Sequence, residues 1–182
     1  SSRARAIIGT APHIRASLRQ VAALSVMARI GWTGRCLATS WVVLPERVDA
    51  LLLEWLTALP QRTVMVLHCN HPNEIDRTVI AAMQQLQQAG VLLLNQSVLL
   101  RGINDDADTL VRLSYRLLAA GILPYYLHQL DRVQGASHFA VDDPAARALM
   151  DAIHIRLPGY LVPRLVRERP DRPGKSPLWP GH

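Results

Sequence analysis

Short apolar runs alternate with longer amphipathic segments from residue 41 to about residue 157, and this alternation limits the possible folds more than any other feature of the chain. The apolar runs are bounded by polar, proline or glycine residues, which is typical of buried strands. These runs are Trp41–Leu44, Thr63–His68, Val91–Leu94 and Ile122–His128. Each run leads into a segment whose apolar residues lie three and four positions apart, which is typical of a helix. The repeated order of strand and helix predicts a parallel α/β array.

The predicted helices have recognisable first residues. These starts are Pro45–Glu46, Asn73–Glu74, Asp106 or Asp108, and Asp142 with Pro144. The first helix is expected to carry its apolar residues on one face, at spacings of three and four. They are Val48, Leu51, Leu52, Trp55 and Leu56. Gly90 and Gly121 are expected to end the second and third helices. A short extended segment is predicted at Gly159–Arg164, and an ordered loop or a loose tail is predicted after it.

The length of the chain restricts the architecture further. A complete (β/α) barrel has eight units and needs roughly 250 residues, so a chain of this size supplies only about four units. The 182 residues therefore predict a partial (β/α) barrel or an open sheet. The expected organisation is an irregular segment 1–41, an α/β part 42–160 and a tail 161–182. Unless the N-terminal segment covers it, the strand at 63–68 is an open edge, which predicts self-association.

Composition restricts the location and the partners. No apolar run approaches the ~20 residues of a membrane span, and no signal peptide is recognisable. Two cysteines, Cys36 and Cys69, form no disulfide framework, so a reducing compartment and hence the cytoplasm is expected. The net charge of +6 lies mainly near the two ends of the chain, which form either a solvated surface or a site for an anionic partner. Aromatic residues near those ends are too sparse for base stacking, so no nucleic acid is expected.

A group of four residues lies at the carboxyl end of the predicted strand at 63–68. Ligands of α/β proteins bind at the carboxyl ends of parallel strands, so this position suggests a site. The residues are His68, Cys69, Asn70 and His71. Two histidines flanking a cysteine could bind a metal ion, but the spacing is tight and no fourth ligand is evident. We therefore expect a polar cluster that positions a substrate, and no metal site.

Two further candidates follow the later strands. Asn95, Gln96 and Ser97 precede Arg101, which either clamps a carboxylate or phosphate or satisfies loop carbonyl groups. Asp131 lies three residues after His128. The pair is consistent with a general base and its orienting partner, with a site for a substrate cation, or with an aspartate that caps a local turn.

Lys175 lies between glycine and proline residues near the end of the chain. A compact amine on a flexible stem suits the formation of an imine with a carbonyl compound. The same local pattern is also typical of an ordinary surface lysine, so spacing alone does not separate the two interpretations.

Four linked segments resemble the carboxyl-terminal half of the lysine 2,3-aminomutase family. They are HCNHPNEID at 68–76, NQSVLLRGIND at 95–105, PYYLHQLDRVQGASHF at 124–139, and GYLVPRLVRE at 159–168 with GKSPL at 174–178. The resemblance covers about residues 42–178, in the same order and with nearly the same spacing. Within the family, the segments are most similar to the branch that makes β-lysine for elongation factor P.

The resemblance implies a partial barrel of the radical S-adenosylmethionine type. It also implies a [4Fe-4S] cluster, S-adenosylmethionine and pyridoxal phosphate as cofactors. The family is an isomerase family that converts L-lysine to β-lysine. The substrate forms an imine with pyridoxal phosphate, a 5′-deoxyadenosyl radical abstracts hydrogen from the β-carbon, and nitrogen moves from carbon 2 to carbon 3. The expected partners are therefore L-lysine and the elongation factor P pathway.

The resemblance also implies roles for individual residues. Lys175 matches the lysine that holds pyridoxal phosphate as an internal aldimine. Asp131 matches an acidic residue that binds the ε-ammonium group of substrate lysine, and Glu168 matches a second acidic partner. Two carboxylates near one ammonium group are physically reasonable, because a buried cation must be paired. The residues that match positions facing the S-adenosylmethionine region are His68, Asn70 and Gln96.

The chain departs from the family at the iron–sulfur cluster. The family holds its cluster with a CxxxCxxC motif, and neither Cys36 nor Cys69 belongs to such a motif. The sequence therefore predicts that this chain alone does not catalyse the reaction, and that it is a fragment, a decayed copy or one piece of a split protein. The alternatives are a non-catalytic α/β module that keeps a pyridoxal phosphate or lysine pocket, or a basic binding protein.

Overall fold

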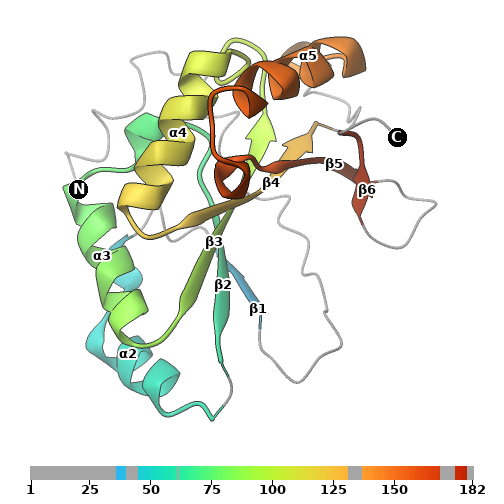
Figure 1. Ribbon diagram of the computed structural model, residues 1–182. Coiled ribbons are helices and arrows are strands. Elements are labelled where there is room, and N and C mark those ends of the chain that lie inside the picture. Colours follow the sequence, from blue (N-terminus) through green and yellow to red (C-terminus); the bar gives the residue numbers. More distant parts are fainter. Residues whose placement is uncertain (1–35, 40–44, 61, 131–136, 169–174, 180–182) are drawn as a thin grey trace. The chain divides into compact units, whose positions relative to one another are not determined.

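A computed structural model describes residues 36–39, 45–60, 62–130, 137–168 and 175–179, which form an α/β structure (Figure 1). The strands are β1 (Cys36–Thr39), β2 (Val64–His68), β3 (Leu92–Leu99), β4 (Leu123–Gln129), β5 (Arg164–Glu168) and β6 (Lys175–Pro177). The α-helices are α2 (Ala50–Thr57), α3 (Arg77–Gln88), α4 (Ala107–Ala119) and α5 (Asp143–His154). Short 3-10 turns are η1 (Pro45–Arg47), η2 (Pro72–Glu74), η3 (Ser137–Phe139) and η4 (Gly159–Leu161). Among these residues, no helix is long and apolar enough to cross a membrane.

The chain divides into two compact units, and each is described by itself. Of the described residues, the first unit contains 36–39, 45–60, 62–69, 73–94 and 120–122, and the second contains 70–72, 95–119, 123–130, 137–168 and 175–179. Strand order is β1-β2-β3 in the first unit and β3-β4-β5-β6 in the second, because β3 contributes residues to both. The domain boundaries expected from the sequence remain a prediction.

Parallel pairing confirms the predicted α/β class. β1 runs parallel to β2, with Cys36 opposite Val64, and β4 runs parallel to β5, with Tyr126 opposite Arg164. The pairing with β1 covers the edge of β2 that the sequence left open. The expected strand at 41–44 lies outside the described residues, and closure into a partial barrel remains a prediction.

In the first unit, α3 follows its predicted apolar pattern, but it begins at Arg77 after the cap Asp76 and not at Asn73–Glu74. The side chains of Val79, Met83 and Leu86 are buried in α3 as predicted.

The predicted apolar face of the first helix is confirmed only in part, because Val48 and Leu56 are buried. In α2, however, Leu51 and Trp55 are 76% and 41% exposed, so the predicted buried face is wrong for these two residues. The expected start at Pro45 is also wrong. The cause is Asp49, whose carboxylate accepts a hydrogen bond from Leu52 N at 2.9 Å and starts the α-helix at Ala50.

In the second unit, local capping bonds decide where the helices begin. The Asp106 carboxylate accepts a hydrogen bond from Thr109 N at 2.8 Å, which makes Asp106 the cap of α4. Asp108, the alternative, instead lies 2.6 Å from Arg156 Nη1, beyond the end of α5. Asp142 caps α5 as predicted, because its carboxylate accepts from Ala145 N at 2.8 Å.

The end of the chain is more ordered than the sequence predicts. The tail expected after Arg164 instead forms β5 and β6, which pair in antiparallel fashion. Leu165 and Val166 of β5 are 0% and 2% exposed, so burial of apolar surface stabilises this segment. After β6, Trp179 Nε1 donates a hydrogen bond to Asp151 Oδ1 of α5 at 2.6 Å. The buried strand and this contact therefore stabilise the described residues 164–168 and 175–179.

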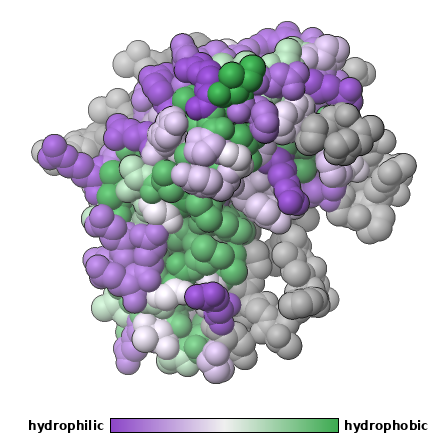
Figure 2. Space-filling model, in the orientation of Figure 1, coloured by the Kyte–Doolittle hydropathy of each residue, from purple (hydrophilic) through white to green (hydrophobic). Residues whose placement is uncertain are grey.

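Polar side chains cover much of the surface around α4 and α5, with smaller apolar areas between them, as Figure 2 shows at the top of the view. The exposed large apolar side chains of the second unit are Tyr115, Leu118, Ile155 and Tyr160. Single exposed apolar residues are normal on a globular surface, and self-association remains a prediction.

Candidate functional site

Lys175 is held by neighbouring strands and is not an isolated surface lysine. It is the first residue of β6, directly opposite Glu168 of β5 in the antiparallel register. Lys175 Nζ lies 3.3 Å from Glu168 Oε1, and the two side chains are 21% and 45% exposed. The amine is thus mostly covered but still reachable from solvent, which an imine-forming lysine requires.

Two further polar groups surround the same amine. Lys175 Nζ lies 3.0 Å from His128 Nε2 of β4 and 3.3 Å from Gln96 Oε1 of β3. His128 Nε2 and Gln96 Oε1 are themselves 3.2 Å apart. Nζ also lies 4.9 Å from the centre of the Tyr126 ring, within the range of a cation–π interaction. We call Lys175, Glu168, His128, Gln96 and Tyr126 the lysine cluster.

The lysine cluster offers as many possible acceptors as a protonated amine has donors. An ammonium group has three N–H donors and no acceptor. The three acceptors around it are Glu168 Oε1, His128 Nε2 and Gln96 Oε1. Burial is the largest cause that raises the pKa of Tyr126, to about 12, followed by its contact with Tyr125. Tyr126 therefore stays a neutral phenol and contributes its ring face to the site.

Lys175 is the only lysine among the 20 lysine and arginine residues of the chain. The other basic side chains counted here are all arginine, so this chain generally uses arginine where it needs a positive charge. That preference does not explain why position 175 is a lysine. Arginine satisfies a carboxylate and an aromatic ring equally well, whereas it cannot form an imine. This count was the sequence signal that could have distinguished Lys175 from an ordinary surface lysine.

Only one of the three polar residues in the middle of β3 belongs to the lysine cluster. Successive side chains of a strand point to opposite faces, so Gln96 is directed away from Asn95 and Ser97. Those two are 1% and 5% exposed, and Asn95 Nδ2 donates a hydrogen bond to Ser97 Oγ at 2.9 Å. They line a cavity of about 10 Å³ beside α4, about the space of one water molecule. Their contribution is therefore to the packing under α4.

Asn70 is held against the end of β3. Its Oδ1 accepts a hydrogen bond from Val98 N at 2.7 Å, and its carbonyl oxygen accepts one from Asn104 Nδ2 at 2.8 Å. Asn104 is completely buried. The expected contact of Asn70 with S-adenosylmethionine remains a prediction.

The other candidates from the sequence are His68, Asp131 and His71. His68 is the last residue of β2 in the first unit, and its expected role remains a prediction. Asp131 lies outside the described residues, so its expected contact with substrate lysine also remains a prediction. Burial, then the charge of Arg112, lowers the pKa of His71. In the described part of the chain, no three histidine, cysteine or acidic side chains are grouped to hold a metal ion.

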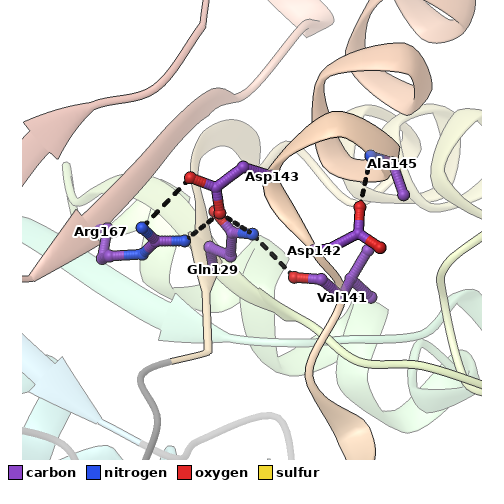
Figure 3. Close-up of polar contacts among 6 residues, drawn as sticks. All are labelled: Gln129, Val141, Asp142, Asp143, Ala145 and Arg167. Atoms are coloured by element: carbon purple, nitrogen blue, oxygen red, sulfur yellow. Dashed lines mark hydrogen bonds and ion pairs between the residues drawn. The ribbon is translucent and has the colours of Figure 1, made fainter.

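A polar network behind β5 was not predicted from the sequence (Figure 3). Arg167 Nη1 donates to Asp143 Oδ2 at 3.3 Å, and Nη2 contacts the other carboxylate oxygen. Gln129 Nε2 donates to Val141 O at 2.7 Å and to Asp143 Oδ1 at 3.1 Å. Arg167 and Glu168 are consecutive and therefore point to opposite faces of β5. By holding Arg167 on one face, the network helps to direct Glu168 toward Lys175 on the other.

Replacing Asp143 by asparagine should destabilise the protein at neutral pH. In acid this destabilisation should disappear. The hydrogen bond from Arg167 is the largest cause that lowers the pKa of Asp143 below 3.8. The carboxylate thus contributes stability above its unfolded-state pKa, and this contribution disappears as the pH falls through the folded-state pKa. The expected decrease in the free energy of unfolding at pH 7 is below about 1 kcal/mol, because a partly exposed ion pair is screened by water.

Urea unfolding of both proteins at pH 7 and near pH 3 measures this effect. The difference in unfolding free energy should be smaller at the lower pH. An equal difference at both values would contradict an ionic role for Asp143.

Comparison with characterised proteins finds several relatives that carry the name L-lysine 2,3-aminomutase. The protein from Escherichia coli (strain K12) is 49% identical over 137 residues, which is 75% of this chain and 40% of the relative. The protein from Haemophilus influenzae is 50% identical over 135 residues, 74% of this chain and 40% of the relative. The protein from Clostridium subterminale is 34% identical over 173 residues, 95% of this chain and 40% of the relative.

The chain spans about two fifths of the length of these relatives, since each match covers 40% of the relative. No model of a protein family matches it. Sequence similarity at 34–50% identity is nevertheless strong across most of the chain.

Proposed function

Because the chain belongs to the L-lysine 2,3-aminomutase family, we propose that it forms the part of such an isomerase that binds pyridoxal phosphate and substrate lysine. The observation that carries this proposal is the lysine cluster, in which the only lysine of the chain meets three polar acceptors. A solvated surface lysine would not require this arrangement. The substrate class, L-lysine, is proposed from the names of the relatives.

The residues of the lysine cluster fit pyridoxal phosphate. When bound, the cofactor would supply an aldehyde that forms a carbon–nitrogen double bond with an amine. Lys175 offers a primary amine that is partly exposed, and it would hold the cofactor. Gln96 and His128 orient this amine from β3 and β4. Tyr126 covers it with the face of its ring.

Glu168 has a second proposed task. Its carboxylate already accepts from a lysine ammonium group, that of Lys175, at 3.3 Å. A carboxylate that accepts from one ammonium group can also accept from another. This supports the proposed role of Glu168 in binding the ε-ammonium group of substrate lysine, together with Asp131.

The cysteines of the chain do not fit a [4Fe-4S] cluster. Cys69 is fully buried, Cys36 lies 33 positions earlier by residue number, and neither belongs to a CxxxCxxC motif. Such a cluster needs several thiolates around one centre. We therefore derive no radical step from these residues and propose that the 182-residue chain does not rearrange lysine by itself.

The finer features of the proposal rest on the resemblance of the four linked segments. They are a partial barrel of the radical S-adenosylmethionine type, contact of His68, Asn70 and Gln96 with S-adenosylmethionine, a place in the elongation factor P pathway, and a cytoplasmic location. A second candidate is a non-catalytic module that keeps only the cofactor or lysine pocket. The missing CxxxCxxC motif favours this candidate.

Covalent capture of pyridoxal phosphate tests the proposed site. The purified chain is incubated with the cofactor, reduced with borohydride, digested and analysed by mass spectrometry. One reduced adduct per chain is expected, on the peptide that contains Lys175. The chain has no other lysine, so an adduct on an ε-amine can be assigned to Lys175 without ambiguity. Capture at a terminal α-amine alone would rule out the proposed site.

A further inference from the structure

We infer that His128 is the acid–base residue that moves protons to and from the Lys175 amine during imine formation. The inference rests on the proposed function and deepens it, because it gives a chemical role to a neighbour of the cofactor lysine. The geometric basis is the 3.0 Å distance between Lys175 Nζ and His128 Nε2, the shortest contact of this amine in the lysine cluster.

The chemistry requires such a group. A protonated primary amine and an aldehyde combine to give a protonated carbon–nitrogen double bond and water. The bond from nitrogen to carbon forms, the bond from carbon to oxygen breaks, and two protons of the nitrogen end on the oxygen that leaves. A group that accepts a proton from Nζ and returns it to this oxygen accelerates the reaction, and neutral imidazole can do both near pH 7.

The surrounding groups are suited to both positions of the proton. While Lys175 is protonated, its donors point to His128, Gln96 and Glu168. After transfer, the proton on His128 Nε2 faces Gln96 Oε1 at 3.2 Å, so it has an acceptor in its new position. The net charge of the lysine cluster is the same before and after transfer.

The other members of the lysine cluster are less suited to this task. A carboxylate such as that of Glu168 is a weaker base than imidazole, and it serves as the counter-ion of the amine. The amide of Gln96 is not a base. The Tyr126 phenol keeps its own proton, because its pKa is raised to about 12. His128 is thus the one base of suitable strength among the described neighbours of Lys175.

The rate of covalent capture distinguishes this role from a structural one. His128→Gln keeps a polar side chain but removes the basic nitrogen, so capture of pyridoxal phosphate should slow by at least about 10-fold. The final extent, one adduct per chain at Lys175, should be unchanged. In His128→Ala, added imidazole should restore the rate in proportion to its concentration. His138→Gln is the matched control, because His138 lies against the Phe139 ring, and it should capture at the unaltered rate.

Several results would overturn the inference. A His128→Gln rate within about twofold of the unaltered chain would remove His128 from proton transfer, while capture at Lys175 would leave the proposed function standing. Failure of imidazole to restore the rate of His128→Ala, with circular dichroism showing an intact fold, would also remove it. If the unaltered chain captured no cofactor at Lys175, both the inference and the proposed function would be wrong.

Discussion

Replacing Lys175 by arginine should abolish covalent capture of pyridoxal phosphate while leaving the fold intact. Arginine keeps a positive charge opposite Glu168 in the register of β5 and β6, and it can also lie over an aromatic ring. Its guanidinium group is always protonated and forms no imine under these conditions. Since the chain has no other lysine, no second ε-amine can replace the lost one. Capture should therefore fall from about one adduct per chain to background.

Three measurements make this result specific. Circular dichroism and urea unfolding should show that Lys175→Arg is as folded as the unaltered chain. Lys175→Ala should also lose capture, although it loses the ion pair as well. Glu168→Gln should retain capture at Lys175, because it leaves the amine in place. An adduct of undiminished yield in Lys175→Arg would show that Lys175 is not the site of attachment.

Replacing Asn104 by alanine should be strongly destabilising, by about 3 kcal/mol. Asn104 is 0% exposed, and its side chain makes three hydrogen bonds to the main chain. Its Oδ1 accepts from Leu100 N at 2.7 Å, and its Nδ2 donates to Val98 O at 2.9 Å and to Asn70 O at 2.8 Å. Removing the amide leaves these three groups without that partner, and each loss costs roughly 1 kcal/mol or more.

Asp105→Ala provides the matched control for this measurement. Asp105 is the next residue in the same turn, and its carboxylate accepts from Gly102 N at 2.8 Å, but the contact is exposed to water. Its replacement should lower the free energy of unfolding by about 1 kcal/mol or less, because water can bind the exposed main-chain amide of Gly102. The two variants are compared by urea unfolding. Equal losses would show that the amide of Asn104 does not organise the turn after β3.

Much of the secondary structure could be predicted because its determinants are local. Asp142 caps its helix as expected, and Gly90 and Gly121 adopt the positive φ values, 81° and 72°, that end helices. Prediction was wrong where two local signals competed, as at Pro45, where the carboxylate of Asp49 starts the helix later. It was also wrong for the tail, because an antiparallel partner strand is a tertiary feature.

The candidate site was predicted in part. Lys175 and Glu168 were identified from motifs as residues near pyridoxal phosphate and substrate, whereas Gln96 was assigned to the S-adenosylmethionine region. The structure brings the side chains of all three together, and their roles remain predictions. The role of His128 at this amine was missed, because the sequence suggested a pairing with its near neighbour Asp131. Side chains alternate between the two faces of β4, so Tyr126 and His128 point to the same face, where both contact Lys175. Such a face can be identified only when the neighbouring strand and its register are known.

By itself the sequence determined the alternation of strands and helices from β2 to α5, the helix caps Asp106 and Asp142, and the identity of the single lysine. These depend on interactions between residues a few positions apart and on the chemistry of each side chain. The tertiary structure alone decided that Lys175 meets Gln96 and His128, which lie 79 and 47 positions earlier. Strand pairing and register place such distant residues side by side, because each strand presents only alternate side chains to a given face.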